Sequence, residues 1–469
     1  MGKSKKHFII EDLLISDAGS EGICVGKYDG QVVFVSNVVP GDIINAEVYK
    51  KKHSYYMARP LEIKVYSPQR ATPLCEHFGV CGGCKWQNMQ YDSQLRYKQK
   101  QVFDNFSRIG KFDFPALSPI LSSENIYAYR NKMEYTFSDK RWLSIEEMEN
   151  KELFNLNGLG FHLSGMYDKV LDIHYCHLHT RMGNEIRNAI KSFAIQNGLS
   201  FYNARNHEGL LRNLIIRHSV CGDLMVIVVF AYKDKYLSML MDYIKVNFPQ
   251  ITSLMYAIND KLNDSLSDVC VQLYAGKAYM IEQMEELLFK VSPQAFYQTN
   301  ASQALKLYQT ARAFAKIEPH HIVYDLYTGT GTIALFVARH AQKVIAVEYV
   351  ASAVENAKEN ARLNHIDNAH FFVGDMAKIF TDEFIQQNGH PHVIITDPPR
   401  NGMHPEVIAQ ILKIKPHRIV YVSCNPATQA RDIALMNPLY QAKAIQPVDM
   451  FPQTHHVENV CLLELRATL

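Results

Sequence analysis

No stretch of this 469-residue sequence stays apolar for the about 18 residues that a membrane-spanning helix needs, so we expect no passage through a lipid bilayer. The chain also has almost no net charge, because 49 basic and 47 acidic side chains leave a formal value of +2. Affinity for a polyanion would therefore have to come from local patches. Internal repeats and low-complexity tracts are absent. With 47% hydrophobic residues, the chain is predicted to form roughly two to four globular domains rather than a coiled coil or a disordered chain.

The basic residues at the start of the sequence, in Met1–Lys6, are not followed by a hydrophobic signal core. We therefore expect a cytoplasmic protein. In that compartment the nine cysteines are not expected to form a disulfide framework. Some of them should instead bind metal or take part in catalysis.

Three cysteines, Cys75, Cys81 and Cys84, share a short segment with glycines that let the backbone wrap around a metal centre. Three thiolates need a fourth ligand, and Cys176, in a polar, turn-like setting, is the best candidate. The spacing fits zinc and an iron–sulfur cluster equally well. The other cysteines outside the catalytic candidate discussed below lie in apolar stretches and are predicted to be small core residues: Cys24, Cys221, Cys270 and Cys461.

Residues 1–66 contain short predicted strands separated by turns, which favours a small β-barrel. Its last strands are expected to bring basic and aromatic side chains to one rim. This composition is typical of OB-like barrels that contact phosphates and stack on bases, although an ordinary solvated hairpin would also show it. The residues concerned are Lys50, Lys51, Lys52, His53, Tyr55, Tyr56 and Arg59.

Residues 67–285 read as an α+β middle region, with an amphipathic helix over 94–112; residues 94–125 could instead pack with the domain that follows. From 286 to 469, a regular alternation of strands and helices predicts a doubly wound parallel sheet. The expected strands are 322–326, 343–347, 392–396, 418–423 and about 459–466, and the expected helices are 303–316, 331–340, 351–364 and 404–413.

The first strand of that sheet runs into a glycine-containing turn in which Gly329 and Gly331 would let a ligand approach the backbone. Together with Ala334 they complete a literal dinucleotide pattern, so the glycines alone do not separate a nicotinamide cofactor from S-adenosyl-L-methionine. The next strand closes on Glu348, which is placed to accept hydrogen bonds from ribose hydroxyls in either ligand.

Two later acids favour the methyl donor. Asp375 suits the adenine side of a nucleoside pocket, and Asp397-Pro398-Pro399 suits a methyl-transfer pocket, because the two prolines fix a rigid turn beside the reacting base. Dinucleotide oxidoreductases have no comparable need. An adenine N-methyltransferase would also place prolines after an acid, but it needs an aromatic residue where this chain has Arg400.

Cys424 lies in Ser423-Cys424-Asn425-Pro426, at the end of an apolar run and at the edge where open α/β sheets bind ligands. A lone cysteine is more often an inert core residue, but this one would stand beside a nucleotide pocket. Thiolate addition to carbon 6 of uracil makes carbon 5 nucleophilic enough to take a methyl group, and the adduct must then lose its carbon 5 proton. Glu458 is the predicted general base, and His456 is a candidate for orienting the substrate.

Taken together, these residues resemble the RNA uracil-5-methyltransferases, specifically the cluster-containing 23S ribosomal RNA branch, over nearly the whole chain. Segments 129–134, 211–217 and 292–300 match further family signatures. The resemblance implies an N-terminal TRAM barrel, which is an OB-like RNA-binding module, and an α+β central domain with an iron–sulfur site. It also implies a C-terminal α/β doubly wound, Rossmann-like methyltransferase domain.

The resemblance also assigns residues. It implies a [4Fe-4S] cluster on Cys75, Cys81, Cys84 and Cys176, and it places Cys424 on the nucleophile and Glu458 on the proton acceptor. Many members have cysteine where this chain has Thr328, and this difference does not change the proposed chemistry. Further family positions, in the donor site or beside the target base, fall on Gln298, Tyr327, Glu348, Asp397 and Phe296.

The expected activity is therefore S-adenosyl-L-methionine-dependent formation of 5-methyluridine in 23S ribosomal RNA by a monomeric enzyme. One alternative keeps the chemistry and changes the substrate to the T-loop uridine of transfer RNA. Another is a catalytically inactive, redox-responsive RNA-binding protein, which the presence of both Cys424 and Glu458 argues against.

Overall fold

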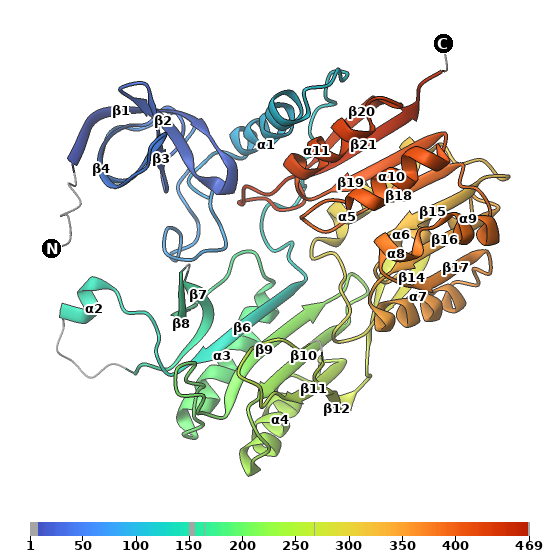
Figure 1. The fold of residues 1–469 in the computed structure, drawn as a ribbon. Coiled ribbons are helices and arrows are strands. Elements are labelled where there is room, and N and C mark those ends of the chain that lie inside the picture. Colours follow the sequence, from blue (N-terminus) through green and yellow to red (C-terminus); the bar gives the residue numbers. More distant parts are fainter. Residues whose placement is uncertain (1–7, 150–154, 164, 267, 468–469) are drawn as a thin grey trace.

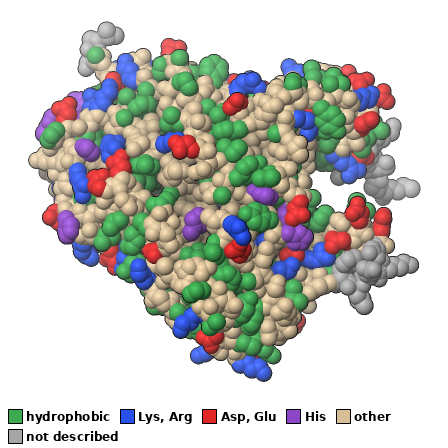
Figure 2. Space-filling model, turned by 180° about the vertical axis from the view of Figure 1, so that it is seen from behind, with side chains coloured by type: hydrophobic (Ala, Val, Ile, Leu, Met, Phe, Trp, Pro, Cys, Tyr) green, Lys and Arg blue, Asp and Glu red, His purple; other side chains and the backbone are tan. Residues whose placement is uncertain are grey.

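The computed structural model describes residues 8–149, 155–163, 165–266 and 268–467, arranged as a barrel, a central domain and a catalytic-type α/β domain (Figure 1). The basic start Met1–Lys6 lies outside these residues. None of the helices they form is long and apolar enough to cross a membrane. Figure 2, seen from behind, shows acidic and basic side chains interspersed rather than gathered by sign, and a notch between the barrel and the central domain.

The N-terminal strands close into a barrel in the order β1-β2-β3-β5-β4. Alternate side chains such as Ile15, Val33 and Ile44 fill its interior. The strands are β1 Phe8–Ala18, β2 Cys24–Tyr28, β3 Gln31–Val35, β4 Ile43–Lys51 and β5 Tyr55–Val65, with a helical turn η1 at Ser20–Gly22. On the predicted rim, Lys50, Lys52 and His53 are exposed, whereas Tyr56 belongs to the barrel core. The expected rim is therefore basic but less aromatic than its sequence suggested.

The segment after the barrel packs against the catalytic domain. Its helix α1, Tyr91–Asn105, continues into a wider turn η2, Phe106–Gly110. Val102 and Phe106 on these elements share one core with Tyr324 and Ile394 of the catalytic sheet. Between barrel and helix, Arg70 makes two hydrogen bonds, of 2.8 and 2.7 Å, to the carboxylate of the fully buried Asp42 and so ties this segment to the barrel.

The central domain is a seven-stranded sheet in the order β12-β11-β10-β9-β6-β7-β8. Its strands are β6 Lys132–Ser138, β7 Gly158–Leu163, β8 Met166–Asp172, β9 Leu211–His218, β10 Leu224–Phe230, β11 Ser253–Ile258 and β12 Val271–Gly276. Its helices are α2 Ile145–Glu149, α3 Arg181–Gln196 and α4 Lys235–Asn247. The apolar stripes of α3 and α4, for example Ile190 and Leu240, pack on the sheet core. A hairpin, β13 Met280–Met284 and β14 Leu287–Val291, then joins the catalytic core.

The C-terminal sheet has the order β17-β16-β15-β18-β19-β21-β20. Its strands are β15 Ile322–Leu326, β16 Lys343–Glu348, β17 Ala369–Val373, β18 Val393–Thr396, β19 Arg418–Ser423, β20 Tyr440–Val448 and β21 Glu458–Leu465. The first five pair in parallel. Four of these strands were predicted, whereas β17 was not among the expected strands. Strand β21 runs antiparallel to both β19 and β20. The expectation of a fully parallel sheet was therefore wrong at this edge, because strand direction depends on how the chain returns and not on local periodicity.

Helices cover both faces of this sheet (Figure 1). On one face lie α5 Ala301–Ala315, α6 Thr332–Ala338 and α7 Ala351–Leu363. On the other lie α8 Met376–Ile379, α9 Asp382–Asn388, α10 Pro405–Ile414 and α11 Pro426–Met436, together with α1. This two-sided cover leaves the carboxyl edge of the parallel strands as the place where a ligand can enter.

Two of the cysteines assigned to the core are not there. Cys24 and Cys461 are buried, as predicted, but Cys221 and Cys270 are exposed. Cys221 lies in the tight turn after β9, where Gly222 adopts a φ of +86° and its N–H bonds back to Ser219. Their apolar neighbours belong to strands that end before, or begin after, these two residues.

Candidate active site

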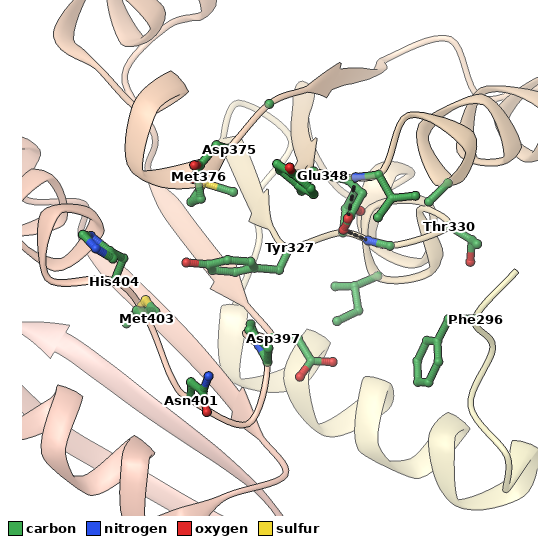
Figure 3. Close-up of a pocket in the computed structure, with 18 of the residues that line it drawn as sticks. Phe296, Tyr327, Thr330, Glu348, Asp375, Met376, Asp397, Asn401, Met403 and His404 are labelled. Atoms are coloured by element: carbon green, nitrogen blue, oxygen red, sulfur yellow. Dashed lines mark hydrogen bonds between the residues drawn. The ribbon is translucent and has the colours of Figure 1, made fainter. Parts of the chain in front are cut away.

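The strand order reverses between β15 and β18, and a cavity of about 1400 Å³ opens at the carboxyl edge of the sheet at this point (Figure 3). We call it the sheet-edge cavity. Tyr327, after β15, and Asp397, after β18, project into it, and Phe296 faces it from the segment before α5. The Asp397 N–H donates to the carbonyl of Leu326 at 3.3 Å, which holds the two strand ends together.

The turn after β15 is shaped to receive a ligand. Tyr327 adopts a left-handed φ of +68°, which is strained for a residue with a side chain. Its N–H and that of Thr328 both donate to the carbonyl of Val347, at 3.1 and 3.0 Å. Gly329, with φ +56°, has no atom within 4 Å of where a Cβ would stand, so open cavity lies against its backbone. At Gly331 a Cβ would lie 2.8 Å from Ala357, so glycine there permits close helix packing.

Glu348, at the end of β16, braces this turn. One carboxylate oxygen accepts a 3.0 Å hydrogen bond from the Gly329 N–H, and the other accepts one of the same length from Val350. Asp375 follows β17 and caps α8, accepting from the Ala377 N–H at 3.1 Å. Both carboxylates line the cavity, and their remaining lone pairs can accept hydrogen bonds from a nucleoside.

Cys424 lies where β19 ends and α11 begins. Its neighbour Asn425 caps that helix by accepting from the Ala427 N–H at 3.2 Å, and Pro426 occupies the first turn, where its missing N–H is not needed. The Asn425 amide also donates to the carbonyl of Arg400 at 2.9 Å. The Asn-Pro pair therefore fixes the thiol against the loop that follows Asp397.

Glu458 reaches the same place through strand pairing. In the antiparallel pair of β19 and β21, Ser423 stands opposite Asn459, so the next pair outward consists of Cys424 and Glu458. Glu458 is only 6% exposed. The structure thus brings together two residues that the sequence places 34 positions apart in the chain.

The electrostatics of this group disfavour negative charge. Burial, followed by the charges of Glu458 and Asp397, raises the pKa of the Cys424 thiol to about 11, while Arg400 opposes the shift. Burial, and then Asp325, raises the pKa of Asp397 to about 7. Burial and Asp397 raise the pKa of Glu458 well above its ordinary value. Three acidic groups within reach of one another do not all ionise together, so the resting thiol is protonated, and Glu458 can accept a proton only in its ionised form.

One residue of this group was not predicted from the sequence. Tyr308, on α5, is 5% exposed and lines the sheet-edge cavity. Burial raises its pKa, the charges of Asp397 and Glu458 raise it further, and the Gln298 side chain lowers it. Its place on an apolar helix face gave no signal of a polar role. Gln298 itself lines the cavity, and its carbonyl accepts from the Asn131 amide of the central domain at 3.1 Å.

Known proteins match this arrangement. A family model described as tRNA (uracil-5-)-methyltransferase matches residues 272–466, and the TRAM domain matches residues 5–61. An uncharacterized RNA methyltransferase of Bacteroides thetaiotaomicron is 53% identical over 95% of this chain and 100% of its own. This chain belongs to the RNA (uracil-5-)-methyltransferase family. A relative from Porphyromonas gingivalis with the same description is 50% identical over 96% of this methyltransferase and 98% of its own chain.

A solved structure agrees over nearly the full length. The tRNA (uracil-54, C5)-methyltransferase of Pyrococcus abyssi, in complex with S-adenosyl-L-homocysteine, has a TM-score of 0.75 at 26% identity, covering 96% of this methyltransferase and 99% of its own chain. The predictions of an N-terminal TRAM barrel, a C-terminal methyltransferase domain and an enzyme that methylates RNA are therefore confirmed.

A second cavity of this methyltransferase, of about 520 Å³, is lined by Cys75, Cys81, Cys84 and Cys176. We call it the cysteine cavity. Burial raises the pKa of the Cys84 thiol to about 12, and the charges of Cys176, Cys81 and Cys75 each raise it further, so all four sulfurs lie within electrostatic reach. The Cys176 N–H donates to the Asn184 side chain of α3 at 2.8 Å. Four converging thiols that repel one another as thiolates fit a cationic metal centre. The positive charge of a bound metal would lower the pKa values of the thiols.

Proposed function

We propose that this methyltransferase makes 5-methyluridine in 23S ribosomal RNA through a covalent bond between Cys424 and the target uracil. The observation that carries the proposal is that Cys424 and Glu458 lie within electrostatic reach of Asp397, which lines a cavity large enough for a nucleoside. A thiol, a proton acceptor beside it and a nucleoside site are the parts that methylation at carbon 5 of uracil requires.

The methyl donor is proposed to be S-adenosyl-L-methionine, which supplies a methyl group on a positively charged sulfur. Glu348 would accept hydrogen bonds from its ribose hydroxyls, and Asp375 would lie on the adenine side. Tyr327 and Asp397 flank the middle of the cavity, and Gly329 leaves room for the ligand at the backbone. Gln298 lines the cavity from the segment that also carries Phe296. The complex of the Pyrococcus abyssi relative with S-adenosyl-L-homocysteine supports this assignment.

The chain's own residues account for the remaining steps. The Cys424 thiol first loses its proton to solvent, and the sulfur then bonds to carbon 6 of the uracil. The electron pair of the double bond between carbons 5 and 6 moves to carbon 5, which takes the methyl group from the donor sulfonium and releases S-adenosyl-L-homocysteine. Glu458 then accepts the carbon 5 proton, the bond between carbon 6 and sulfur breaks, and the ring double bond re-forms. The raised pKa of Glu458 suits this step, because a carboxylate with a higher pKa is a stronger proton acceptor. The target base must leave its stack to reach this group.

The resemblance to the 23S branch is what supports ribosomal RNA as the substrate class. A T-loop uridine of transfer RNA is the second candidate, because the matching family model and the Pyrococcus abyssi enzyme are both described by transfer RNA. Mapping 5-methyluridine by mass spectrometry in ribosomal and transfer RNA, from cells with and without this protein, separates them. Loss of the modification from 23S RNA supports the proposal, and loss only from transfer RNA overturns the substrate assignment.

We further propose that the cysteine cavity holds a [4Fe-4S] cluster with all four cysteines as ligands. A fully ligated cluster has no open iron site, so its role would be structural or RNA-positioning rather than radical initiation. Protein purified without oxygen should contain sulfide and on the order of four irons per chain, and it should absorb visible light as iron–sulfur clusters do. Zinc alone would overturn this assignment.

A further inference from the structure

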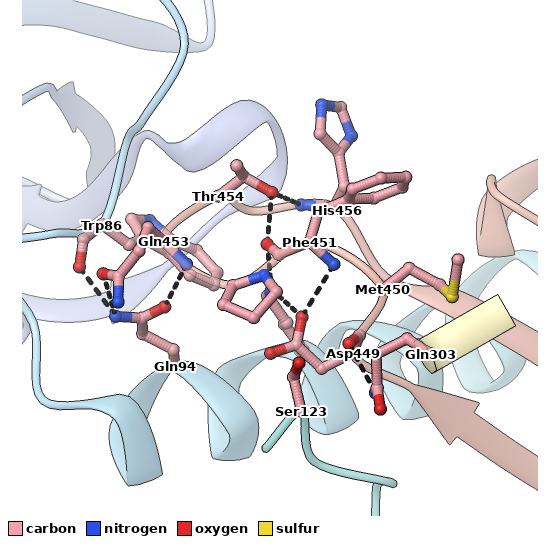
Figure 4. Close-up of polar contacts among 12 residues, drawn as sticks. Trp86, Gln94, Ser123, Gln303, Asp449, Met450, Phe451, Gln453, Thr454 and His456 are labelled. Carbon is pink, nitrogen blue, oxygen red and sulfur yellow. Dashed lines mark hydrogen bonds and ion pairs between the residues drawn. The ribbon is translucent and has the colours of Figure 1, made fainter. Parts of the chain in front are cut away.

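The loop between β20 and β21, residues 449–457, leads directly into Glu458 and is buried for much of its length. We call it the β20–β21 loop. Asp449, Gln453 and Thr454 are 0%, 3% and 4% exposed. Such polar groups require partners. Partners of this loop come from three places, of which Trp86, Gln94 and Gln303 are drawn in Figure 4. The cysteine segment, residues 75–90, provides Lys85 and Trp86, and α1 provides Gln94 and Lys98. The catalytic domain provides Asn300 and Gln303, which donate to the carbonyls of Met450 and Asp449 at 2.9 and 2.8 Å.

Gln453 joins the β20–β21 loop to the cysteine segment by hydrogen bonds. It holds a left-handed φ of +68°, and its carbonyl accepts two 3.0 Å hydrogen bonds, from the N–H groups of Lys85 and Trp86. These are the two residues that follow Cys84. The next loop residue, Thr454, lines the cysteine cavity itself. The β20–β21 loop therefore rests on the backbone of the cysteine segment.

Gln94 on α1 completes the connection. Its amide N–H groups donate to the Gln453 side-chain oxygen at 3.0 Å and to the carbonyls of Trp86 and Met89 at 3.0 and 2.9 Å. Its side-chain oxygen accepts from the Gln453 N–H at 2.9 Å. One buried amide thus bonds to the cysteine segment and to the loop at once.

One helical turn further along α1, a buried ion pair fixes the start of the loop. Lys98 donates to Asp449 at 2.5 Å and to the carbonyl of Phe451 at 3.0 Å, and both charged side chains are 0% exposed. Tyr91 donates to the other Asp449 oxygen at 2.7 Å. Gln94 and Lys98 are four residues apart, so they extend from the same face of the helix.

The support of Cys424 is different. The thiol is positioned by β19, by the Asn425 cap of α11 and by the carbonyl of Arg400, all within the catalytic domain. Glu458 shares this sheet through its pairing with Val448. The loop that precedes Glu458 is bonded both to the catalytic domain and to the cysteine segment. Cys424 is therefore positioned by the catalytic domain, whereas the position of Glu458 also depends on contacts with the cysteine segment.

We propose that the Gln94–Gln453 pair couples the state of the cysteine cavity to the placement of Glu458, so that losing either the pair or the metal slows proton removal and leaves addition by Cys424 intact. Gln94 and Gln453 are positioning residues in this scheme. The inference rests on the proposed function. A displacement of the base by about 1 Å is enough to cost on the order of 10- to 100-fold in the step it serves.

The test compares Gln94→Met with Asn364→Leu. Asn364 is a matched control, because it is also a buried amide that bonds a neighbouring segment both ways, donating to the Leu288 carbonyl at 2.7 Å and accepting from the Leu288 N–H at 2.8 Å. It has no contact with the β20–β21 loop among the hydrogen bonds of the described residues. Gln453→Met is the milder companion, because the backbone bonds to Lys85 and Trp86 can persist.

Turnover and the share of RNA in covalent adduct are measured with substrate RNA, and amide hydrogen exchange of residues 449–457 is measured on the protein without RNA. Gln94→Met should lower turnover about 10- to 100-fold. It should also raise the adduct share and speed exchange in the loop, with a smaller change in the same direction for Gln453→Met. Metal-stripped wild-type protein should show the same pattern, and Asn364→Leu should resemble wild type.

The outcomes separate the two proposals. If the wild type forms no adduct at all, the proposed function fails. If the wild type forms and resolves the adduct, and both glutamine variants resolve it equally fast, only the coupling is overturned. A fall in adduct share together with turnover also overturns it, because the addition step would then depend on the pair.

Discussion

Glu458→Gln is the sharpest perturbation of the active site, because an amide keeps the size and shape of the side chain but cannot accept a proton. Loss of a positioned general base costs about 10²- to 10⁴-fold, or about 3 to 5 kcal/mol in the barrier of the step. Glu458 is only 6% exposed, so solvent is poorly placed to substitute for it, and the loss should fall in the upper part of that range. Turnover should nearly stop after the methyl group has been transferred.

The assay is a denaturing gel with labelled substrate RNA, in which an RNA bonded to protein migrates slowly. Glu458→Gln should accumulate this species, and adding Cys424→Ala to it should remove the species. Glu464→Gln is the matched control, since it lies at the far end of the same strand, where Glu464 pairs with Lys316 and Arg418 at 3.6 and 3.5 Å. Normal turnover by Glu458→Gln, or a variant that neither turns over nor traps RNA, would refute the assignment of Glu458.

Three further results are expected. Glu348→Ala should weaken S-adenosyl-L-homocysteine binding by about tenfold, because the Gly329 and Val350 N–H groups lose their acceptor. Glu355→Ala, at an exposed position of α7, should leave this affinity unchanged; calorimetry measures both, and equal affinities would contradict the donor site. Turnover should rise between pH 6 and 8, since the pKa of Asp397 is raised to about 7 and that of Glu458 lies above its ordinary value, so both lose protons as pH increases; a flat profile would count against these groups. Burial lowers the pKa of His218 to about 4 in the folded protein, below its unfolded value, so its contribution to folding is complete above about pH 6.5 and is lost as pH falls. The free energy of unfolding, measured with denaturant, should fall between pH 7.5 and pH 5 by about 2 kcal/mol less in His218→Gln than in the wild type, and an equal fall in both would contradict this assignment.

Most parallel strands of the catalytic sheet could be predicted from the sequence because each is a short, mainly apolar run, and β16 and β18 end at or just before an acid, Glu348 and Asp397. The expected strands 322–326, 343–347 and 418–423 agree with β15, β16 and β19 to within one residue. The edge was harder to predict. Strand β20 contains Pro447, which argues against a strand from local rules, and it is tolerated because β20 lies at the edge of the sheet.

In the candidate site, too, some features could be predicted from local sequence and others could not. Residues such as Cys424 and Asp397 carry a local signal, since each follows an apolar strand and precedes a proline. That Cys424 and Glu458 meet depends on the register of an antiparallel pair, which no local pattern encodes. The partners Gln94 and Gln453 stand 359 positions apart, and Lys98 and Asp449 stand 351 apart, so only the folded chain reveals the connection between the cysteine segment and the loop before Glu458.

The central claim is a bond between the Cys424 sulfur and carbon 6 of a uracil, and substrate RNA containing 5-fluorouridine tests it most directly. Fluorine at carbon 5 leaves no proton for Glu458 to remove, so the methylated adduct cannot resolve. Mass spectrometry of the digested complex should find the peptide containing Cys424 carrying a fluorouridine nucleotide plus one methyl group. A nucleotide attached to any other residue, or no attachment under conditions where ordinary RNA is methylated, would contradict the account.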